Sequence, residues 1–561
     1  MIILGVNYFF HDSSACLLKD GELIVALEEE RFTRKKHSHQ FPNNAIEQCL
    51  KYADIDPSEI DHIAVSIKPS KHWFKKLVYC LSLGLKMGPF ISHELKGTIF
   101  KLRDFNKWYE SFTRNNNKPT VHFVEHHMSH IAGTYFLSPY EDAALLSLDG
   151  SGEWSTLFVG EASKGSIEKY SETMFPHSLG SFYEAATEFC GFRPNYDEGK
   201  TMGLAPFGDP SRFYNIVDKI VTVNDDATVT IDLSYFNYQN WSRRRCSDKF
   251  YSTFGKPRKN DGEFLDHHHD VAAAFQKVLE DKVLQICRYL EKKTKAEHIV
   301  LAGGVSLNSV MNGRILRETR FKDLYVMPAA GDNGTSIGAA YYVHHEILGN
   351  KKRFFHSNPY VGNHYLKEDI RRILEECKLP FKESKDVCKE TAEMLRSGNI
   401  IGWFQGRMEI GPRALGNRSI LADPTLDGMK DKINAEVKHR EAYRPFAPSA
   451  TVEAKDEFFD IEVEAPFMLK VCDVKEDKKD LIPAITHVDG SARLQTVKKE
   501  TNQRYHQLIT EFGKLSGIPV LLNTSFNIMG EPIVESPLHA IRCFFSTGLD
   551  VLVIDDFIVK K

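Results

Sequence analysis

Residues 2–31 read I-I-L-G-V-N-Y-F-F-H-D-S-S-A-C-L-L-K-D-G-E-L-I-V-A-L-E-E-E-R, and this stretch decides the fold of the first half of the chain. Polar turns separate three short apolar runs, and Asp20-Gly21 is a typical two-residue hairpin turn. The pattern therefore predicts three consecutive antiparallel strands. The same pattern recurs at residues 143–168, where A-A-L-L-S-L, S-T-L-F-V-G-E and S-K-G-S-I are again separated by turns.

Each copy of this unit has an aspartate in its first turn, Asp12 or Asp149, beside small residues. Small residues let the backbone approach a phosphate, and an aspartate there can hold a metal ion or water. A duplicated unit with helical segments between and after the copies matches the architecture of actin-like ATPases. In that fold the two turns hold the phosphates of one nucleotide. Two unrelated hairpins are the alternative.

A third glycine-containing turn favours nucleotide binding. Residues 298–310, H-I-V-L-A-G-G-V-S-L-N-S-V, predict a strand, a paired-glycine turn and a helix. Amide groups at the start of such a helix can face a phosphate. The candidate nucleotide-binding residues of the first domain are Asp149, Gly150, Gly303, Gly304 and Asn308.

A pair of histidines, His126 and His130, stands in the run V-E-H-H-M-S-H. If this run is helical, the two imidazoles lie on one face, four residues apart, and can share a metal ion. Asp332, in the glycine turn G-D-N-G, is the candidate third ligand. The alternative is an ordinary polar helix face with a turn aspartate that only caps a helix.

The composition is ordinary for a globular protein and gives no argument for a nucleic-acid partner. The chain has 561 residues, and 72 Lys+Arg nearly balance 76 Asp+Glu, so there is no basic stripe to suggest an RNA or DNA partner. Its 10 cysteines are scattered, which favours reduced thiols in a cytoplasmic protein. The N-terminus lacks a basic region and turns polar early, so we expect neither a signal peptide nor a membrane span.

A polar, turn-rich stretch, G-N-K-K-R-F-F-H-S-N-P-Y-V-G, predicts a domain boundary near residue 355. We therefore expect two domains, residues 1–355 and residues 356–561. The second domain alternates helical and strand patterns: helices near 387–397 and 426–437, strands at I-I-G-W-F and I-P-V-L-L-N, and V-L-V-I as the last strand. This order predicts an α/β fold.

The second domain carries basic residues in glycine or proline contexts. An arginine in a rigid turn loses little entropy on binding, and its planar fork suits phosphate or carboxylate oxygens. Four such segments together favour an oxyanion pocket, whereas each arginine alone is better explained as a surface salt bridge. The segments hold Arg413 with Arg418, Lys438 with Arg444, Arg493, and the strand end with Asn523, Ser525 and Asn527.

In these motifs the chain resembles the NodU/TobZ-type O-carbamoyltransferases over almost its whole length. The first-domain motifs are H-D-S-S-A, E-E-E-R-F-T-R-K-K-H, H-H-M-S-H, D-G-S-G-E, Y-D-E-G-K-T-M-G-L-A-P, A-G-G-V-S-L-N and G-D-N-G. The second-domain motifs are G-P-R-A-L-G-N-R-S, Y-R-P-F-A-P and L-N-T-S-F-N. The resemblance implies a duplicated actin-like (ASKHA) domain, similar to that of tRNA threonylcarbamoyl transferase, followed by a YrdC-like domain.

The resemblance also implies a two-step reaction. The second domain would form carbamoyl-adenylate from carbamoyl phosphate and ATP, with Mg²⁺ accompanying ATP. The first domain would pass the carbamoyl group to a hydroxyl of a small-molecule or glycan acceptor. By the same resemblance His126, His130 and Asp332 would hold Fe(II), although zinc or manganese would also suit such ligands. His11 would be the acid/base, and the ligands of carbamoyl phosphate and ATP would be Arg413, Lys438, Arg444, Arg493, Asn523 and Ser525.

Several alternatives stay open at this point. A tRNA threonylcarbamoyl-type transferase is a close rival, and a sugar kinase on the actin-like fold would use the duplicated turns but neither the histidine pair nor the second domain. Lys200 fits a phosphate contact or an exposed loop position equally well. Residues 69–118, with Trp73 and Phe74 among basic residues, fit an acceptor or partner surface, or packing helices. The acceptor is unspecified, and a homodimer is compatible with the sequence.

Overall fold

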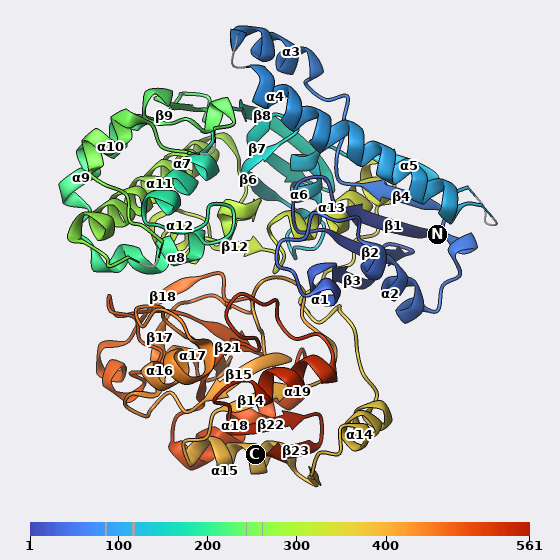
Figure 1. Ribbon diagram of the computed structural model, residues 1–561, viewed down its shortest axis with the longest axis vertical. Helices are drawn as coiled ribbons and strands as arrows, with labels where there is room; N and C mark the ends of the chain where they lie inside the picture. The colour runs from blue at the N-terminus through green and yellow to red at the C-terminus, as the bar shows by residue number, and fades with distance from the viewer. Residues whose placement is uncertain (85–86, 115–117, 243, 261) are drawn as a thin grey trace. The chain divides into compact units, whose positions relative to one another are not determined.

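A computed structural model describes the chain from residue 1 to 561 except residues 85–86, 115–117, 243 and 261. The chain forms two compact units (Figure 1). The first consists of Met1–Glu29 and His37–His356, and the second of Glu30–Lys36 and Ser357–Lys561. The sequence-based division into two continuous segments did not anticipate that residues 30–36 belong to the second unit.

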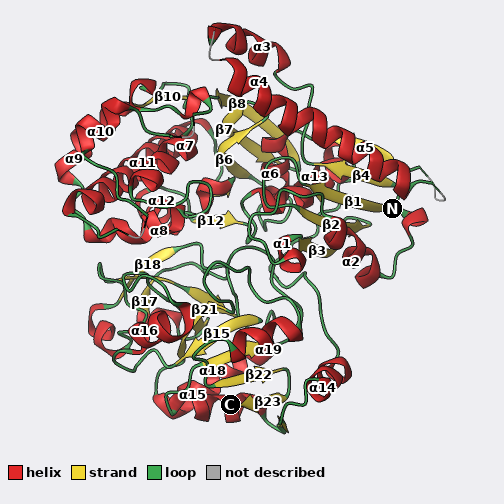
Figure 2. Ribbon diagram, viewed as in Figure 1, coloured by secondary structure: helices red, strands yellow, loops and turns green. Residues whose placement is uncertain are grey.

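The first unit contains two five-stranded sheets with the same strand order (Figure 2). In each, a three-stranded antiparallel meander is followed by two strands parallel to its first strand. The predicted duplication is therefore confirmed. The first sheet, in the order β3-β2-β1-β4-β5, contains β1 (Ile2–Asn7), β2 (Ser14–Lys19), β3 (Glu22–Glu28), β4 (His62–Val65) and β5 (Thr120–Phe123). The second, in the order β8-β7-β6-β11-β12, contains β6 (Ala143–Gly152), β7 (Ser155–Ser163), β8 (Ser166–Met174), β11 (His298–Ala302) and β12 (Asp323–Val326).

The local sequence explains both meanders. Asp20 and Gly21 have φ values of 53° and 86°, and Lys164 and Gly165 have φ values of 51° and 81°. Two consecutive positive φ values are what a type I′ hairpin turn requires, and its twist matches the strands that it joins. All six residues of β1 are buried, because this strand lies at the centre of its sheet.

Two helices of the first unit cross closely. One carries the predicted metal ligands His126 and His130, and the other follows the turn that contains the third, Asp332. These are α6 (His126–Tyr135) and α13 (Thr335–Tyr342). A methyl group at Gly338 would overlap the backbone carbonyl of Ser129, and one at Gly133 would lie 3.0 Å from the Gly338 Cα. Glycine at both positions therefore permits the crossing.

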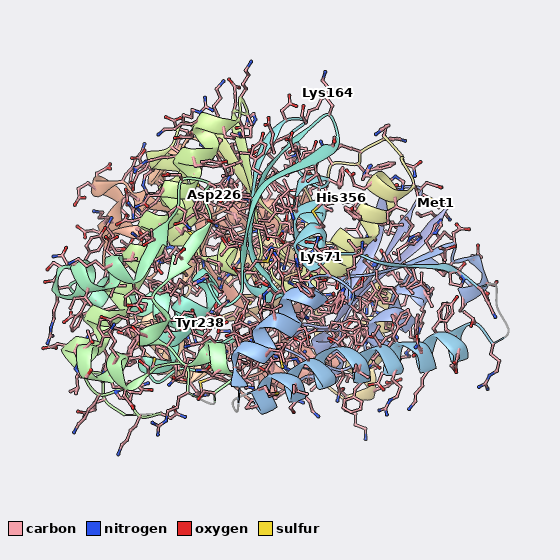
Figure 3. The ribbon with its side chains drawn as sticks, turned by 90° about the horizontal axis from the view of Figure 1, so that it is seen from above. Met1, Lys71, Lys164, Asp226, Tyr238 and His356 are labelled. Atoms are coloured by element: carbon pink, nitrogen blue, oxygen red, sulfur yellow. The ribbon has the colours of Figure 1, made fainter. Side chains whose placement is uncertain are left out.

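The other elements of the first unit surround these sheets. Helices α3–α5 run along one side of the unit (Figures 1 and 3). The helices are α2 (Asn43–Ala53), α3 (Trp73–Ser82), α4 (Met87–Glu94), the π-helix η3 (Leu95–Phe100), α5 (Lys101–Phe112), α7 (Leu179–Phe189), α8 (Glu198–Leu204), α9 (Ser211–Ile220), α10 (Asp248–Phe254), α11 (Asp266–Lys293) and α12 (Ser309–Glu318). A small hairpin joins β9 (Val221–Val223) to β10 (Val229–Ile231).

The second unit is built on an eight-stranded mixed sheet, as the predicted α/β class requires. Its order is β13-β23-β22-β14-β15-β21-β16-β20, with a separate three-stranded sheet β17-β18-β19. The strands are β13 (Lys382–Glu383), β14 (Ile401–Phe404), β15 (Arg418–Ala422), β16 (Ala447–Thr451), β17 (Phe459–Asp460), β18 (Val471–Val474), β19 (Ser491–Arg493), β20 (Gln495–Val497), β21 (Val520–Ser525), β22 (Val551–Ile554) and β23 (Phe557–Lys560). The predicted last strand, V-L-V-I, is β22, and β23 follows it as its antiparallel neighbour.

Helices cover both faces of this large sheet. Trp403, on the central strand β14, is fully buried in the apolar layer that contains Leu508 and Phe512 of α18. The opposite layer includes Phe544 of α19. The helices are α1 (Glu30–Thr33), α14 (Lys367–Glu376), α15 (Val387–Arg396), α16 (Met429–Lys432), the π-helix η10 (Ile433–Lys438), α17 (Lys455–Phe458), α18 (Gln503–Ser516) and α19 (Pro537–Phe545).

Candidate metal centre and cation pocket

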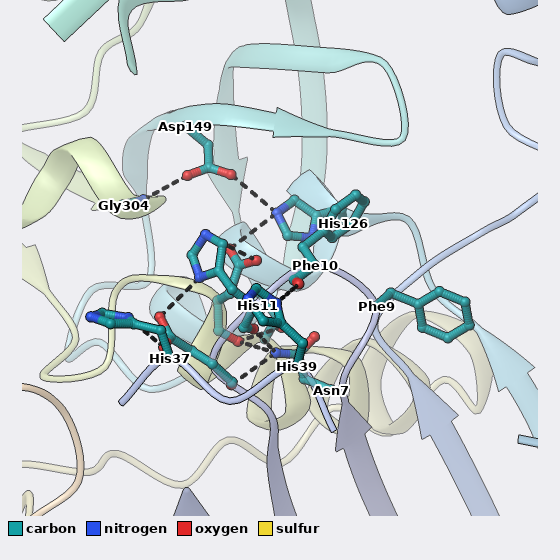
Figure 4. Close-up of polar contacts among 12 residues, drawn as sticks. Asn7, Phe9, Phe10, His11, His37, His39, His126, Asp149 and Gly304 are labelled. Carbon is teal, nitrogen blue, oxygen red and sulfur yellow. Dashed lines mark hydrogen bonds and ion pairs between the residues drawn. The ribbon is translucent and has the colours of Figure 1, made fainter. Parts of the chain in front are cut away.

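Four side chains of the first unit converge on one point. They are His126 and His130 on α6, Asp149 on β6 and Asp332 in the short 3₁₀ turn η8 (Asp332–Gly334). The two imidazole Nε2 atoms lie 3.0 Å apart. Asp149 Oδ2 lies 3.2 Å from the Nε2 of His126 (Figure 4), and Asp332 Oδ1 lies 3.5 Å from the Nε2 of each histidine.

This spacing fits a divalent cation. A tetrahedral ion about 2.1 Å from each nitrogen or oxygen ligand separates those ligand atoms by about 3.4 Å. The measured separations, 3.0 to 3.8 Å, bracket that value. Among the described residues, Asp332 Oδ1 is also a buried oxygen without a hydrogen-bond donor. Such an atom is costly to leave unpaired, and a metal ion would compensate it.

Three members of this cluster, His126, His130 and Asp332, are the candidate metal ligands that the sequence predicted. Asp149 was predicted as a nucleotide-binding residue whose turn, like that of Asp12, could also hold a metal ion or water, but the sequence did not group it with the histidine pair. The structure brings it to the histidine pair because β6 ends beside α6. The run D-G-S-G-E does not indicate which other residues would share such an ion, since it is distant in sequence from Asp332.

Residues around the histidines fix their orientation. Gly152 is required because a methyl group there would overlap the His126 ring. Both carboxylate oxygens of Glu153 accept hydrogen bonds from the His126 backbone N–H, each at 3.1 Å. Asn7 donates its side-chain amide to the backbone carbonyl of Asp332 at 2.9 Å and to that of His11 at 3.1 Å.

His11 lies beside this cluster on the loop between β1 and β2. Its Nδ1 is 2.9 Å from Asp12 Oδ2, and its Nε2 is 3.8 Å from Asp332 Oδ2. His37 Nδ1 is 2.8 Å from the other oxygen of Asp12, so one carboxylate links two imidazoles (Figure 4). The His11 side chain is 35% exposed, which leaves it accessible to an acceptor.

The charges of the cluster favour a cation. Burial by itself lowers the pKa of His126, but Asp332 and Asp149 outweigh it and raise that pKa to about 10. Burial would raise the pKa of both aspartates, yet the imidazoles hold each pKa well below its usual range. His127 is the contrasting case, because burial and the neighbouring His126 lower its pKa to about 3. The two carboxylates thus create a negative field where the Nε2 atoms meet.

Three other predicted nucleotide-binding residues, Gly150, Gly303 and Gly304, lie close to Asp149. The Gly304 backbone N–H donates to Asp149 Oδ1 at 3.0 Å (Figure 4). Gly303 has a φ of 84°, and a side chain there would overlap the Leu148 carbonyl. Asn308 caps α12 by accepting the Met311 N–H, and Gly150 is adjacent to Asp149 in the chain. Lys200 is half-buried, and its Nζ lies 3.2 Å from Asp197 Oδ1.

A group of cations occupies the second unit. Burial, followed by repulsion from Arg444, lowers the pKa of Arg413 to about 10 and that of Arg440 to about 9. Burial and then Arg413 lower the pKa of Arg493 well below its usual range. The Nε atoms of Arg413 and Arg493 are buried without hydrogen-bond acceptors among the described residues. These mutually repelling, partly unsatisfied guanidinium groups are suited to bind a multiply charged anion.

Several other residues of the second unit that the sequence predicted to bind an anion have defined hydrogen-bond partners. Lys438 Nζ donates to Asn527 Oδ1 at 2.9 Å and to the backbone carbonyl of Ser525. Asn523 is buried and donates to the Ala414 carbonyl at 3.2 Å, next to Arg413. Arg418 differs from the expectation of an anion ligand. Its guanidinium donates to the carbonyls of Gln405 and Asn417 and packs 3.6 Å from the Phe404 ring, so it stabilises the loop.

Arg440 is a member of this group that sequence reasoning missed. Its Nε donates to Asn434 Oδ1 at 2.8 Å, and its guanidinium packs over the Phe446 ring. Arg440 stands in the run V-K-H-R-E-A-Y-R between Lys438 and Arg444, and nothing in the sequence marks it as a further ligand. Only the tertiary structure shows that Arg440 lies close enough to Arg444 and Arg493 to repel them.

Comparison with known families gives the identity of the chain. A model described as carbamoyltransferase N-terminus matches residues 2–341, and one described as carbamoyltransferase C-terminus matches residues 392–561. The chain belongs to the carbamoyltransferase family. It is a carbamoyltransferase of the NodU/NolO type, as the motifs of the sequence predicted.

Individual relatives span nearly the whole chain. An uncharacterized protein of Synechocystis is 38% identical over 602 residues, which cover 100% of this chain and 96% of that protein. Nodulation protein NolNO of Sinorhizobium fredii is 36% identical, over 99% of this chain and 80% of its own length. The solved component A of the Acidaminococcus fermentans (R)-2-hydroxyglutaryl-CoA dehydratase is 14% identical, with a TM-score of 0.34, over 62% of this carbamoyltransferase and 99% of that chain.

Within the part of the carbamoyltransferase that the structure describes, every helix is too short or too polar to cross a membrane.

Proposed function

We propose that this carbamoyltransferase is ATP-dependent and acts on hydroxyl groups. The observation that carries the proposal is the occurrence of two chemically different centres in one chain. One is the buried group of His126, His130, Asp149 and Asp332 in the first unit. The other is the arginine-rich group in the second unit. A carbamoyl group is a poor electrophile, so separate activation and transfer steps would account for both centres.

The first step would take place in the second unit. Water cleaves carbamoyl phosphate to carbamate and phosphate, and a carbamate oxygen then attacks the α-phosphorus of ATP. The products are carbamoyl-adenylate and pyrophosphate. Arg413, Arg440, Arg444 and Arg493 would stabilise the charge on the phosphates without reorganising, since their geometry is already fixed. Lys438, Asn523 and Ser525 would orient the substrates at the end of β21.

The second step would take place in the first unit. The acceptor hydroxyl attacks the carbonyl carbon of carbamoyl-adenylate, the bond to the phosphate breaks, and AMP leaves. His11 would accept the hydroxyl proton on Nε2, because Asp12 occupies its Nδ1 at 2.9 Å. The glycine turns at Gly150, Gly303 and Gly304, with Asn308, would hold the nucleotide portion beside Asp149.

A divalent metal ion would be held by His126, His130, Asp149 and Asp332. A metal ion at such a site polarises an oxygen on which negative charge develops. Iron(II) is the ion that the family resemblance implies, and two histidines with carboxylates also suit zinc or manganese. Mg²⁺ would accompany ATP in the first step.

The proposed acceptor is a small molecule or glycan rather than RNA. The near-balance of 72 basic and 76 acidic residues gives no excess of positive charge for a tRNA threonylcarbamoyl-type substrate. A sugar kinase would have no use for the arginine-rich group of the second unit. The protein would act in the cytoplasm, where ATP and carbamoyl phosphate are available.

Pyrophosphate release by the full-length protein, with and without carbamoyl phosphate, tests the proposal. Release that requires both ATP and carbamoyl phosphate is expected. ATP cleavage to ADP in the presence of a sugar would instead identify a kinase. If metal-loaded protein releases no pyrophosphate with both substrates present, with or without candidate acceptors, the proposed activation step is wrong.

A further inference from the structure

Helix α3 has an apolar face that points to solvent. We call Trp73, Phe74, Leu77, Val78 and Leu81 the α3 apolar face. Trp73 and Phe74 are each 63% exposed, and Leu81 is 66% exposed. The spacings from 73 to 77 and 81, and from 74 to 78, place these side chains along adjacent rows of one helical surface. So many large apolar side chains in solvent on one helix of ten residues indicate a surface that binds something.

The opposite side of α3 already anchors the helix to its own unit. Tyr79 lies 5.1 Å from the Trp154 ring and donates its hydroxyl to the Gln239 carbonyl at 2.9 Å. Cys80 belongs to the same buried cluster, together with Phe90 of α4 and Trp154. The α3 apolar face is therefore not required for packing within the unit. A helix that is apolar on both sides is typical of one that is buried in protein or lies in a membrane interface.

The segment that contains α3 is basic in sequence, whereas the chain as a whole is slightly acidic. Residues 71–107 contain eight Lys and Arg but only two acidic residues, Glu94 and Asp104, whereas the whole chain carries a net charge of −4. Lys75 is exposed on α3 itself, whereas Lys71, labelled in Figure 3, pairs with Glu125 and Lys76 pairs with Glu94, each at 2.8 Å. Basic residues next to exposed Trp, Phe and Leu are complementary to an anionic lipid surface, which supplies both negative headgroups and an apolar layer.

From this combination we propose that the α3 apolar face docks on the surface of an anionic lipid bilayer. Trp73, Phe74 and Leu77 enter the boundary between headgroups and acyl chains, and Lys75 contacts the headgroup phosphates. The helix lies on the membrane and does not cross it, since α3 has ten residues. A second copy of the chain is a less suitable occupant, because a symmetric contact through this face would bring two basic segments together.

Flotation of the full-length protein with vesicles tests this proposal. Phosphatidylcholine vesicles are compared with vesicles that also contain phosphatidylglycerol. We expect the protein to float with the anionic vesicles and to be released by high salt, which screens the headgroup charges. The triple variant Trp73→Ser/Phe74→Ser/Leu77→Ser should lower the partition coefficient by at least about tenfold, because it removes the apolar contribution. Lys75→Glu should weaken binding to the anionic vesicles only.

A matched control separates this face from general hydrophobicity. The double variant Phe207→Ser/Phe355→Ser removes two phenylalanines, 41% and 54% exposed, elsewhere in the first unit, and should float like the unaltered protein. Circular dichroism and thermal unfolding should be the same in all variants, which verifies that they fold. Trp73 offers an independent signal: the fluorescence difference between the unaltered protein and Trp73→Phe should shift to the blue when vesicles are added.

Three results would overturn the proposal. One is the absence of vesicle binding and of any Trp73 shift in the unaltered protein. Another is an equal loss of binding in the control and triple variants. The third is a concentration-dependent dimer, measured by light scattering without lipid, that the triple variant abolishes while vesicles have no effect. That last result would identify a second copy of the chain as the occupant.

Discussion

At the residue scale, Asp149 connects two features that the sequence presents separately. One carboxylate oxygen accepts the Gly304 N–H at 3.0 Å, and the other lies 3.2 Å from His126 Nε2. A metal ligand and a nucleotide-turn residue can therefore be the same side chain. This arrangement would place a bound phosphate close to the metal ion, where carbamoyl transfer from an adenylate requires charge stabilisation.

His130→Ala should greatly reduce bound metal, because it removes one of the two imidazole ligands. Loss of a residue that only supports a ligand costs about 10- to 100-fold in metal affinity, so loss of the ligand itself should cost at least as much. Elemental analysis of the purified variant is the measurement. His127→Ala is the matched control, since its Nδ1 contacts Ser147 Oγ at 2.9 Å and its ring lies outside the cluster. A full metal content in His130→Ala would exclude this histidine as a ligand.

Arg444→Ala should reduce pyrophosphate release by at least about 100-fold in kcat/KM, because it removes a fixed cation from the proposed phosphate site. The pyrophosphate assay with carbamoyl phosphate and ATP measures this effect. Arg372→Ala, on the exposed helix α14 of the same unit, removes an equal charge and should have no effect. Equal activities of the two variants would argue against the arginine-rich group as the activation site.

At the scale of elements, the crossing of α6 and α13 determines whether the metal ligands meet. Asp332 begins the 3₁₀ turn that leads into α13, and His126 and His130 belong to α6. Gly133 and Gly338 let the two helices approach so closely that ligands from distant parts of the chain share one site. The candidate metal centre thus depends on Gly133 and Gly338, which have no side chain that could bind a metal.

Gly338→Ala should separate these helices, since the new methyl group would overlap the Ser129 carbonyl. We expect the free energy of unfolding to fall by about 1–3 kcal/mol, as in other overpacked interiors, and the metal content to fall with it. Calorimetry and elemental analysis are the measurements. Gly199→Ala, at a helical position with open space around it, should change neither quantity. Unaltered metal content in Gly338→Ala would mean that the crossing can adjust.

The segment Glu30–Lys36 lies near the N-terminus in sequence but packs in the second unit. Arg31 Nη2 donates to the Gly411 carbonyl at 2.8 Å, two residues before Arg413. Arg34 donates to the carbonyls of Pro532 and Ile533 at 2.6 and 2.7 Å. The N-terminal part of the chain thus stabilises loops near the arginine-rich group of the second unit.

Arg31→Ala should lower pyrophosphate release while the metal content stays unchanged, because Arg31 stabilises the loop that carries Arg413 and belongs to the second unit. The expected reduction is about tenfold, as for loss of one or two hydrogen bonds to a charged group. Lys35→Ala changes an exposed residue of the same segment and serves as the control. A loss of metal without a loss of pyrophosphate release would contradict the assignment of this segment.

At the scale of the whole molecule, the two units would divide one reaction between them. Each has its own hydrophobic core and its own group of functional side chains. The proposed intermediate, carbamoyl-adenylate, hydrolyses readily, so it must be kept from water between its formation and its use.

If the work is divided in this way, His130→Ala should still release pyrophosphate yet fail to modify an acceptor. The two activities are measured in the same sample, as pyrophosphate and as carbamoylated product. Thermal unfolding of the variant provides the control for intact folding. Loss of both activities in a well-folded variant would mean that the first unit controls activation as well as transfer.

The sequence by itself determined the duplicated strands, the helical histidine pair and the family. These features depend on local patterns: the alternation of apolar and polar residues, Asp-Gly turns, and the four-residue spacing of histidines. Strand identity at Ile2–Asn7 and the helix at His126–Tyr135 follow from such short-range rules. The motifs also indicated the basic character of the second unit.

Only the tertiary structure decided which of these residues meet. Asp149 joins the histidines, Arg440 joins the other arginines, Arg418 turns to backbone carbonyls, and residues 30–36 enter the second unit. A turn aspartate or a loop arginine looks the same in sequence whether its side chain faces a ligand or its own backbone. The partners of such a side chain are set by contacts between residues that are hundreds of positions apart in sequence, such as those of Gly338 with α6. Local sequence patterns do not encode these contacts.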